Sequence, residues 1–411
     1  MEIRALLSAM GRNKTGPILV AAQVAITLAV LVNVAYIIQY RLAAIAEPTG
    51  LDAPNIFWIV SQSYSPEYNH AAAVEADLDY LQSIPGVIAA TTTGNIPQGS
   101  SNTSLPFAAE ESVLQKGGGV PAVVFFGSAN YTQTLGVKLA SGRPFDPAAV
   151  QPPVKDFREM MGNWGSEVII TKNLAAKLWP NQNPLGKTLY TGLVNKPATV
   201  VGIIDYMQHR PTTGPVAELF RTIVIVPTIV PGPGIAYMVR TEPGRRDATM
   251  ARVEKELEGR QPGRYIAAME ALEMTMSRQR QGARTSIFTL GIVAIFVLGV
   301  TVVGIVGLAA FTVATRTKQL GTRRAIGATK FHILRYFLVE NWLITTVGAL
   351  VGCALAVGVG IKLSLMYQMP RLPLLYLVGG VVTLWVLGVL AVWLPARRAA
   401  SISPAVATRT V

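Results

Sequence analysis

Residues 314–341 read ATRTKQLGTRRAIGATKFHILRYFLVEN, a basic stretch between two long apolar runs. The first run, residues 287–313, carries no charge and would measure about 40 Å as a helix, against roughly 30 Å of hydrocarbon in a bilayer. The second uncharged run, residues 341–361, is also long enough to span. Because positively charged loops between spans face the cytoplasm, the basic stretch is predicted to lie on that side.

The basic stretch also has an internal apolar pattern. Leu320, Ile326 and Ile333 lie among the basic residues at spacings that suit one or two short helices. Gly321 and Gly327 are predicted to break the run. We expect a helical segment, held between two membrane spans, that a cytoplasmic protein could push.

Composition supports a membrane protein. Charged residues make up 14% of the chain, against about 25% in soluble domains, and hydrophobic residues make up 51%. The net charge of +13 is concentrated in residues 1–14, 314–341 and 397–411, whereas residues 41–284 are nearly balanced. The basicity therefore indicates membrane topology and not a nucleic-acid partner.

The fold class predicted from these patterns is a multi-pass α-helical membrane protein with four transmembrane helices. A large α/β extracytoplasmic domain, residues 41–284, is expected between the first and second spans. The spans are predicted at residues 16–40, 285–313, 339–362 and 372–396. The cytoplasmic parts are an amphipathic helix at residues 1–15, for which a frayed terminus is the alternative, a hinge at 314–338, and a tail at 397–411.

Residues 41–284 show mixed strand and helix patterns. The predicted strands are residues 55–62, 87–93, 122–127, 167–170, 198–205, 221–227 and 235–240. The predicted helices are residues 69–83, 173–179, 246–260 and 267–285. The last helix is expected to run directly into the second span, so that it could transmit motion.

The apolar runs contain glycines at helical spacing. Gly348 and Gly352 form a G-x-x-x-G pattern in the third span, and Gly304 and Gly307 give the second span a similar small-residue character. Such glycines permit close helix packing within a bundle or form a dimer interface, and both interpretations stay open.

The residues give no sign of a catalytic, cofactor or metal site. The single cysteine, Cys353, lies in the third span, and the three histidines are scattered. Gly186-Lys187-Thr188 resembles the end of a phosphate-binding loop, but Asn181 stands where that motif requires glycine. The chain is therefore predicted not to be an enzyme.

Several motifs resemble the MacB/FtsX-like permease family. The family's hinge typically runs R-T-x-E-I-G-x-x-R-A-x-G-A, and its ending resembles LPARRAASISPAVATR at residues 394–409. Segments 135–146, 167–179, 183–189 and 200–206 are similar to the MacB-type periplasmic core domain. The hinge residues that match are Arg316, Thr317, Gly321, Arg324, Ala325, Gly327 and Ala328. The chain departs from the pattern at Lys318-Gln319, where the family commonly has glutamate in the second position, and this favours a nonidentical permease partner.

The resemblance implies the permease subunit of an ABC-type export complex in the bacterial inner membrane, with both termini cytoplasmic. ATP would be used by a separate ATPase subunit, whose hydrolysis is coupled to extracytoplasmic conformational change. The expected partners are that ATPase, a second permease copy in a homodimer or heterodimer, and a membrane-fusion adaptor with an outer-membrane channel. The expected substrate is a small molecule or peptide for efflux.

Three other functions remain as alternatives. A lipoprotein-releasing permease shares this ectodomain size, whereas a non-transporting regulator of a cell-wall hydrolase usually has a shorter one. A membrane-anchored ectodomain enzyme is disfavoured because no cluster of nucleophile, base or metal ligands is evident.

The hinge is the predicted docking surface for the ATPase. Basic residues alone would suffice to orient the chain in the membrane, so the apolar residues between them indicate a further role. A basic loop resting on anionic headgroups is the simpler alternative. The predicted coupling residues are Arg316, Leu320, Gly321, Arg323, Arg324, Ala325, Ile326, Gly327, Ala328 and Phe331.

The charge asymmetry predicts the topology. A reporter fused within residues 138–196 should report an extracytoplasmic location, and one fused at Gly327 a cytoplasmic location. An extracytoplasmic signal from the Gly327 fusion would contradict four spans in this orientation.

Overall fold

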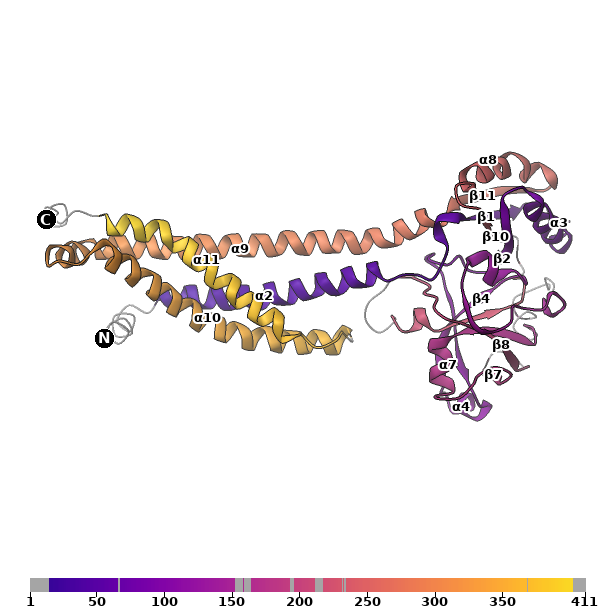
Figure 1. Cartoon of the computed structure of the whole chain (residues 1–411), viewed down its shortest axis with the longest axis horizontal. Coiled ribbons are helices and arrows are strands. Elements are labelled where there is room, and N and C mark those ends of the chain that lie inside the picture. Colours follow the sequence, from indigo (N-terminus) through magenta and orange to yellow (C-terminus); the bar gives the residue numbers. More distant parts are fainter. Residues whose placement is uncertain are drawn as a thin grey trace. The chain divides into compact units, whose positions relative to one another are not determined.

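The computed structural model describes residues 15–65, 67–151, 158, 164–192, 196–210, 217–230, 232, 234–367 and 369–401, without the side chains of residues 323 and 367. The chain forms two compact units (Figure 1). Ala43–Arg284 is an α/β unit, and Met1–Leu42 with Thr285–Val411 is a helical unit. Residues 1–14 of the predicted amphipathic helix and residues 402–411 of the predicted tail lie outside the described residues.

Four long helices account for the predicted membrane spans. They are α2 (Thr15–Ala46), α9 (Leu272–Ala325), α10 (Lys330–Tyr367) and α11 (Leu374–Ala400). All four are long and apolar enough to cross a membrane. Helices α2 and α9 extend well beyond the predicted spans 16–40 and 285–313, since both continue into residues of the α/β unit.

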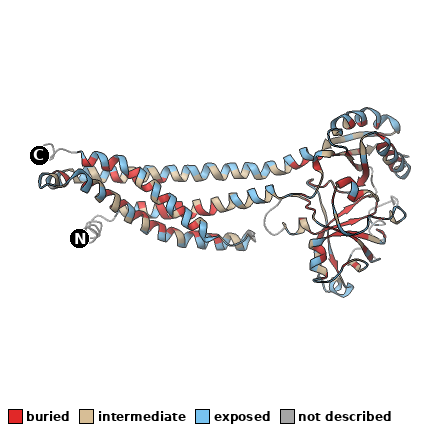
Figure 2. Ribbon diagram, in the orientation of Figure 1, coloured by how far each residue is buried: buried red, intermediate tan, exposed pale blue. Residues whose placement is uncertain are grey.

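Large apolar side chains lie exposed along α9. Phe288 and Phe296 are each 70% exposed, and Ile295 is 71% exposed. Figure 2 shows α9 mostly in the colours of exposed and intermediate residues. Contiguous apolar surface of this kind is unfavourable in water and is the normal surface of a helix in lipid. The exposure pattern therefore agrees with a membrane environment around this part of α9.

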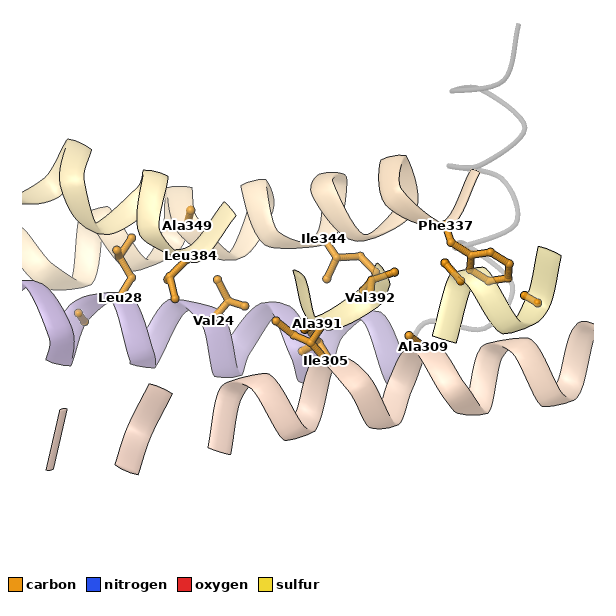
Figure 3. Packing of buried hydrophobic residues seen from close by; sticks show 14 of the residues in the cluster. Val24, Leu28, Ile305, Ala309, Phe337, Ile344, Ala349, Leu384, Ala391 and Val392 are labelled. Atoms are coloured by element: carbon orange, nitrogen blue, oxygen red, sulfur yellow. The ribbon is translucent and has the colours of Figure 1, made fainter. Parts of the chain in front are cut away.

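One apolar cluster with residues from all four helices forms the interior of the helical unit, and part of it is shown in Figure 3. It includes Val24, Leu28, Ile305, Ala309, Ile344, Ala349, Leu384, Ala391 and Val392. At Gly348 an added Cβ would lie 2.6 Å from the carbonyl oxygen of Ala21, and at Gly352 it would lie 2.8 Å from that of Ala25. Glycine at these two positions therefore lets the backbones of α2 and α10 approach closely.

The two glycines of the second span, Gly304 and Gly307, differ in how closely other atoms approach them. An added Cβ at Gly304 would collide with the side-chain amide of Gln23, whereas at Gly307 it would meet no described atom within 4 Å. Gly307 therefore makes no close packing contact with the described part of this chain, because its face of α9 is exposed.

Polar side chains of α2 add hydrogen bonds between the helices. Gln23 Nε2 donates to the carbonyl oxygen of Val300 at 2.8 Å, and the hydroxyl groups of Thr27 and Thr301 lie 2.6 Å apart. Asn33 Nδ2 donates to the carbonyl oxygen of residue 356 in α10 at 3.1 Å. In an apolar environment such bonds fix the rotation of one helix against its neighbours.

A four-stranded antiparallel sheet forms the first part of the α/β unit. Its strands, in spatial order, are β11 (Arg264–Ala271), β1 (Ile56–Ser63), β10 (Gly234–Thr241) and β2 (Val87–Thr93). Successive side chains of a strand point to opposite faces, so Phe57 and Ile59 pack with α3 (His70–Ser83) and α8 (Arg246–Glu256), while Ile56 enters a second core. Burial of both faces explains the nearly continuous apolar sequence of β1.

A seven-stranded mixed sheet forms the second part. Its order is β5 (Leu139–Gly142), β8 (Ala198–Ile204), β6 (Glu167–Thr171), β9 (Ile223–Val226), β4 (Val120–Phe126), β3 (Thr103–Ala108) and β7 (Thr188–Thr191). An additional pairing of β7 with β8 closes the sheet on itself. Val124 and Phe126 pack into one core, and Val123 and Phe125 pack into the core that Ile56 also enters. The two sheets therefore share an apolar core. Short helices α4 (Glu111–Gln115), α5 (Tyr131–Leu135) and α7 (Lys172–Leu178) complete the unit.

The predicted helix over residues 267–285 is wrong in its first part. Residues 267–271 belong to β11, and the helix begins at Leu272. The sequence Ala-Ala-Met-Glu-Ala favours a helix locally, but pairing with β1 overrides this weak preference. Strands β3, β5 and β7 were not predicted, because two of them span only four residues and Pro106 interrupts the third.

Buried polar groups stabilise specific positions in the α/β unit. Arg264 and Asp77 form a fully buried ion pair that ties β11 to α3, and Tyr237 OH donates to Asp77 Oδ2 at 2.7 Å. His209 packs between Phe125 and Phe220, and burial lowers its pKa to about 4, so its imidazole is neutral at physiological pH.

The packing of α10 on α2 predicts unequal effects for the same substitution at two glycines. Gly348→Leu should lower the free energy of unfolding by about 2 kcal/mol, because the added side chain collides with the backbone of α2. Gly358→Leu should change it by less than about 1 kcal/mol, because no described atom lies within 4 Å of an added Cβ there. Thermal unfolding of the detergent-solubilised chain measures both, and equal destabilisation would contradict the packing.

Candidate functional site

A hairpin joins α9 to α10 within the predicted hinge. Helix α9 ends at Ala325 and α10 begins at Lys330, so residues 326–329 form the turn. Gly327 has φ +105°, a conformation that glycine adopts far more readily than other residues. The Thr329 hydroxyl accepts a 3.3 Å hydrogen bond from the backbone N–H of His332 and so caps the start of α10. The hinge is therefore formed by the ends of two long helices and not by separate short ones.

Gly321 does not break the helix, contrary to prediction. Helix α9 continues through it, and Gly321 is buried. One glycine inside a helix costs only about 1 kcal/mol, which the surrounding packing offsets.

Buried apolar side chains connect the hairpin to the interior of the helical unit. Leu320, Ile333 and Phe337 are 3–4% exposed and belong to the apolar cluster of the helical unit. Ala396 and Ala399 near the end of α11 belong to the same cluster. The predicted coupling residue Leu320 is thus part of the hairpin's support and is not available to a partner.

An ion pair joins the two arms of the hairpin. Arg316 Nη1 donates to Glu340 Oε1 at 3.2 Å and to the hydroxyl group of Tyr336 at 3.0 Å. The side chain of Glu340 is only 9% exposed. Glu340 is the only acid in the basic stretch, but the sequence did not show that Arg316 is its partner.

The turn itself carries exposed apolar side chains. Ile326 is 82% exposed and Phe331 is 67% exposed. Ala325 and Gly327 are also exposed, and Ala328 is half-buried. Large apolar groups at an exposed, positively charged turn are typical of a docking surface. We call residues 325–331 the hairpin tip. Arg324 is half-buried just before it, and the side chain of Arg323 lies outside the described part of the structure.

The first turn of α9 is anchored in the α/β unit. Trp58 Nε1 in β1 donates to Thr275 Oγ1 at 2.8 Å, and Arg246 Nη1 in α8 donates to Glu273 Oε2 at 2.8 Å. Leu272 is fully buried in the core that both sheets share. These contacts fix the start of α9 to the four-stranded sheet and its helices.

The end of α2 is anchored differently. Glu47, the residue after α2, forms an ion pair with Arg221 and accepts hydrogen bonds from Tyr206 OH at 2.7 Å and Gln208 Nε2 at 3.2 Å. Burial and the Glu47 carboxylate raise the pKa of Tyr206 to about 12, so its hydroxyl group stays protonated and donates. All three partners adjoin strands β8 and β9 of the seven-stranded sheet. The two helices are therefore held by different sheets.

Two protein families match the chain. The MacB-like periplasmic core domain matches residues 18–259, and the FtsX-like permease C-terminal domain matches residues 291–404. Both are permease-type domains.

Individual relatives are similar over parts of their length. The macrolide export ATP-binding/permease protein MacB of Bartonella henselae is 27% identical over 348 residues, which are 81% of this chain and 47% of that protein. The pyoverdine export ATP-binding/permease protein PvdT of Pseudomonas putida is 29% identical over 231 residues, 55% of this chain and 35% of that protein. The chain thus spans less than half the length of these curated relatives.

Among solved structures, the periplasmic region of MacB from Actinobacillus actinomycetemcomitans is similar. It is 12% identical with a TM-score of 0.32, and the match covers 56% of this chain and 94% of that one.

The Arg316–Glu340 pair predicts a non-additive effect on stability. Arg316→Met should destabilise the chain by about 2 kcal/mol, because the Glu340 carboxylate is left without its cation in a buried position. The double variant Arg316→Met/Glu340→Leu should recover part of this loss, and Arg335→Met, at an exposed position of α10, should have little effect. Thermal unfolding in detergent tests this, and additive losses in the double variant would show that the two residues do not interact.

Proposed function

Because the chain belongs to the permease family that combines a MacB-like periplasmic core domain with an FtsX-like permease C-terminal domain, we propose that it is the permease subunit of an ABC-type export complex whose ATPase is a separate protein. The hairpin tip is the surface on which that ATPase docks. The observation that carries this proposal is the contrast between exposed Ile326 and Phe331 and the buried residues that hold the turn in place.

The proposed location is the bacterial inner membrane. The hairpin and both termini face the cytoplasm, and the α/β unit is extracytoplasmic. The excess of lysine and arginine in residues 314–341 and 397–411, together with the nearly balanced charge of residues 41–284, supports this orientation.

Helix α9 is the proposed path of the motion. It contains 54 residues without a break and is therefore about 80 Å long. A displacement of the hairpin tip by the ATPase reaches Thr275 and Glu273 along one helix, and these residues are bonded to β1 and α8. ATP hydrolysis outside this chain thus changes the conformation of the α/β unit.

The proposed substrate is a small molecule or peptide that is exported. The names of the relatives, which refer to macrolide and pyoverdine export, support this class. A second permease copy, identical or related, and a membrane-fusion adaptor with an outer-membrane channel complete the proposed complex.

A charge placed on the hairpin tip tests the docking. Ala325→Glu should abolish co-purification of a candidate ATPase and substrate-stimulated ATP hydrolysis, because a carboxylate would be forced into an apolar contact, while folding stays intact at this exposed position. Gln319→Glu, which adds the same charge at an exposed position six residues earlier, should retain both co-purification and stimulated ATP hydrolysis.

Equal ATPase recovery and undiminished turnover with Ala325→Glu would show that the hairpin is a membrane-facing basic loop. Loss of both activities with Gln319→Glu as well would point to a general charge effect and not to a local surface.

A further inference from the structure

A groove in the α/β unit has no part in the proposed coupling path. It lies between α8 and the edge strand β11 and has a volume of about 480 Å³. Its apolar lining is Met250, Ala251, Ile266 and Met269, and its carboxylates are Asp247, Glu254 and Glu258.

A β-bulge gives the groove its apolar floor. In a regular strand, residues three positions apart point to opposite faces, so Ile266 and Met269 would not share one side. The pairing with β1 shifts between Val60 and Ser61, which oppose Ala268 and Ile266, so residue 267 is the extra residue of a bulge. The bulge turns the remainder of β11 so that Ile266 and Met269 both line the groove.

The outer edge of β11 is open beside this groove. Strand β11 is the first in the order β11-β1-β10-β2 and, within the described part of the chain, it pairs with β1 alone. An edge strand presents unpaired N–H and C=O groups to which an extended segment can add. The edge is accessible, since Tyr265 is 42% exposed and residue 267 is also exposed.

The charge of the groove determines which segment suits it. Glu254 lies on α8 and Glu258 begins the 3-10 helix η4 (Glu258–Arg260) that follows it. Both are exposed, and no described side chain forms an ion pair with either. Two nearby arginines have other partners: Arg252 binds Glu256, and the Arg260 guanidinium stacks on Tyr80 at 4.1 Å. Carboxylates and apolar side chains therefore line the groove together.

We propose that the groove between α8 and β11 binds a basic, extended segment of a partner protein. The segment adds to the open edge of β11, places apolar side chains on Ile266 and Met269, and pairs lysine or arginine side chains with Glu254 and Glu258. This interaction is independent of ATPase docking at the hairpin tip.

The test uses the purified full chain in detergent micelles. The probe is a fluorescently labelled heptapeptide, acetyl-KVKVKVK-amide, whose binding is followed by fluorescence anisotropy at low and moderate salt. We expect saturable binding that weakens as salt rises.

Two arginine variants of α8 form a matched pair. Ala251→Arg should weaken binding at least about tenfold, because the guanidinium group fills the groove and pairs with its carboxylates. Ala248→Arg, exposed on the same helix but outside the groove lining, should change binding by less than about twofold. Equal effects of the two variants would overturn the proposal.

Two neutralised carboxylate pairs provide a second comparison. Glu254→Gln/Glu258→Gln should weaken binding at least about tenfold, whereas Glu75→Gln/Asp79→Asn, an equally spaced exposed pair on α3, should not. Equal loss in both would reduce the interaction to diffuse attraction and overturn the site.

The remaining outcomes distinguish other occupants. The same heptapeptide with every backbone amide nitrogen methylated lacks the N–H groups for strand pairing and should not bind, and equal binding would overturn strand addition. If spermine displaces the peptide from the unmodified chain and binds Ala251→Arg more weakly, the groove would be assigned to a small polycation. A lower oligomeric mass of Ala251→Arg without peptide would assign it to a second copy of the chain.

Discussion

Uninterrupted backbone hydrogen bonding along α9 is the constraint on which the proposed coupling depends. Within hydrocarbon, a helix satisfies every backbone N–H and C=O group internally, so the central part of α9 has no alternative conformation of similar energy. The same helix continues at both ends beyond the apolar run, into the hairpin and into the α/β unit. Since β11 ends at Ala271 and α9 begins at Leu272, no flexible linker lies between the sheet and the helix.

The helical unit is held together by close approach and polar contacts. Lipid is as apolar as a leucine side chain, so burial of apolar surface between helices contributes little in a membrane. Gly348 and Gly352 bring α10 onto the backbone of α2, and the hydroxyl groups of Thr27 and Thr301 join α2 to α9. The Arg316–Glu340 pair holds α9 and α10 together at the hairpin. Apolar contacts such as those of Leu320 are non-directional and alone would not fix the register of these two arms.

The sequence predicted those elements whose signal is local. Spans follow from uncharged length, and strands such as β2 and β8 follow from apolar β-branched runs bounded by turn residues. It could not predict that Gly321 stays helical or that residues 267–271 form a strand, because tertiary packing overrides weak local preferences at both places. The pairing of Arg316 with Glu340, 24 positions apart, depends on the geometry of the hairpin, and the bulge at residue 267 depends on the register with β1.

The anchoring of α2 and α9 in different sheets determines which contacts can yield when the two helices move relative to each other. Glu47 is bonded to the seven-stranded sheet through directional hydrogen bonds, and Thr275 is bonded to β1 of the four-stranded sheet. Hydrogen bonds weaken steeply when their geometry is distorted, whereas apolar contacts are non-directional. The two sheets meet in the shared core, in which Ile56 and Met238 from one sheet lie with Phe125 from the other. Directional bonds also join them, since the backbone N–H of Gly94 donates to the carbonyl oxygen of Phe126 at 2.9 Å and Asn95 Nδ2 donates to that of Val124 at 3.0 Å. In the proposed coupling, force along α9 would therefore act on these hydrogen bonds between the end of β2 and β4 as well as on the apolar core.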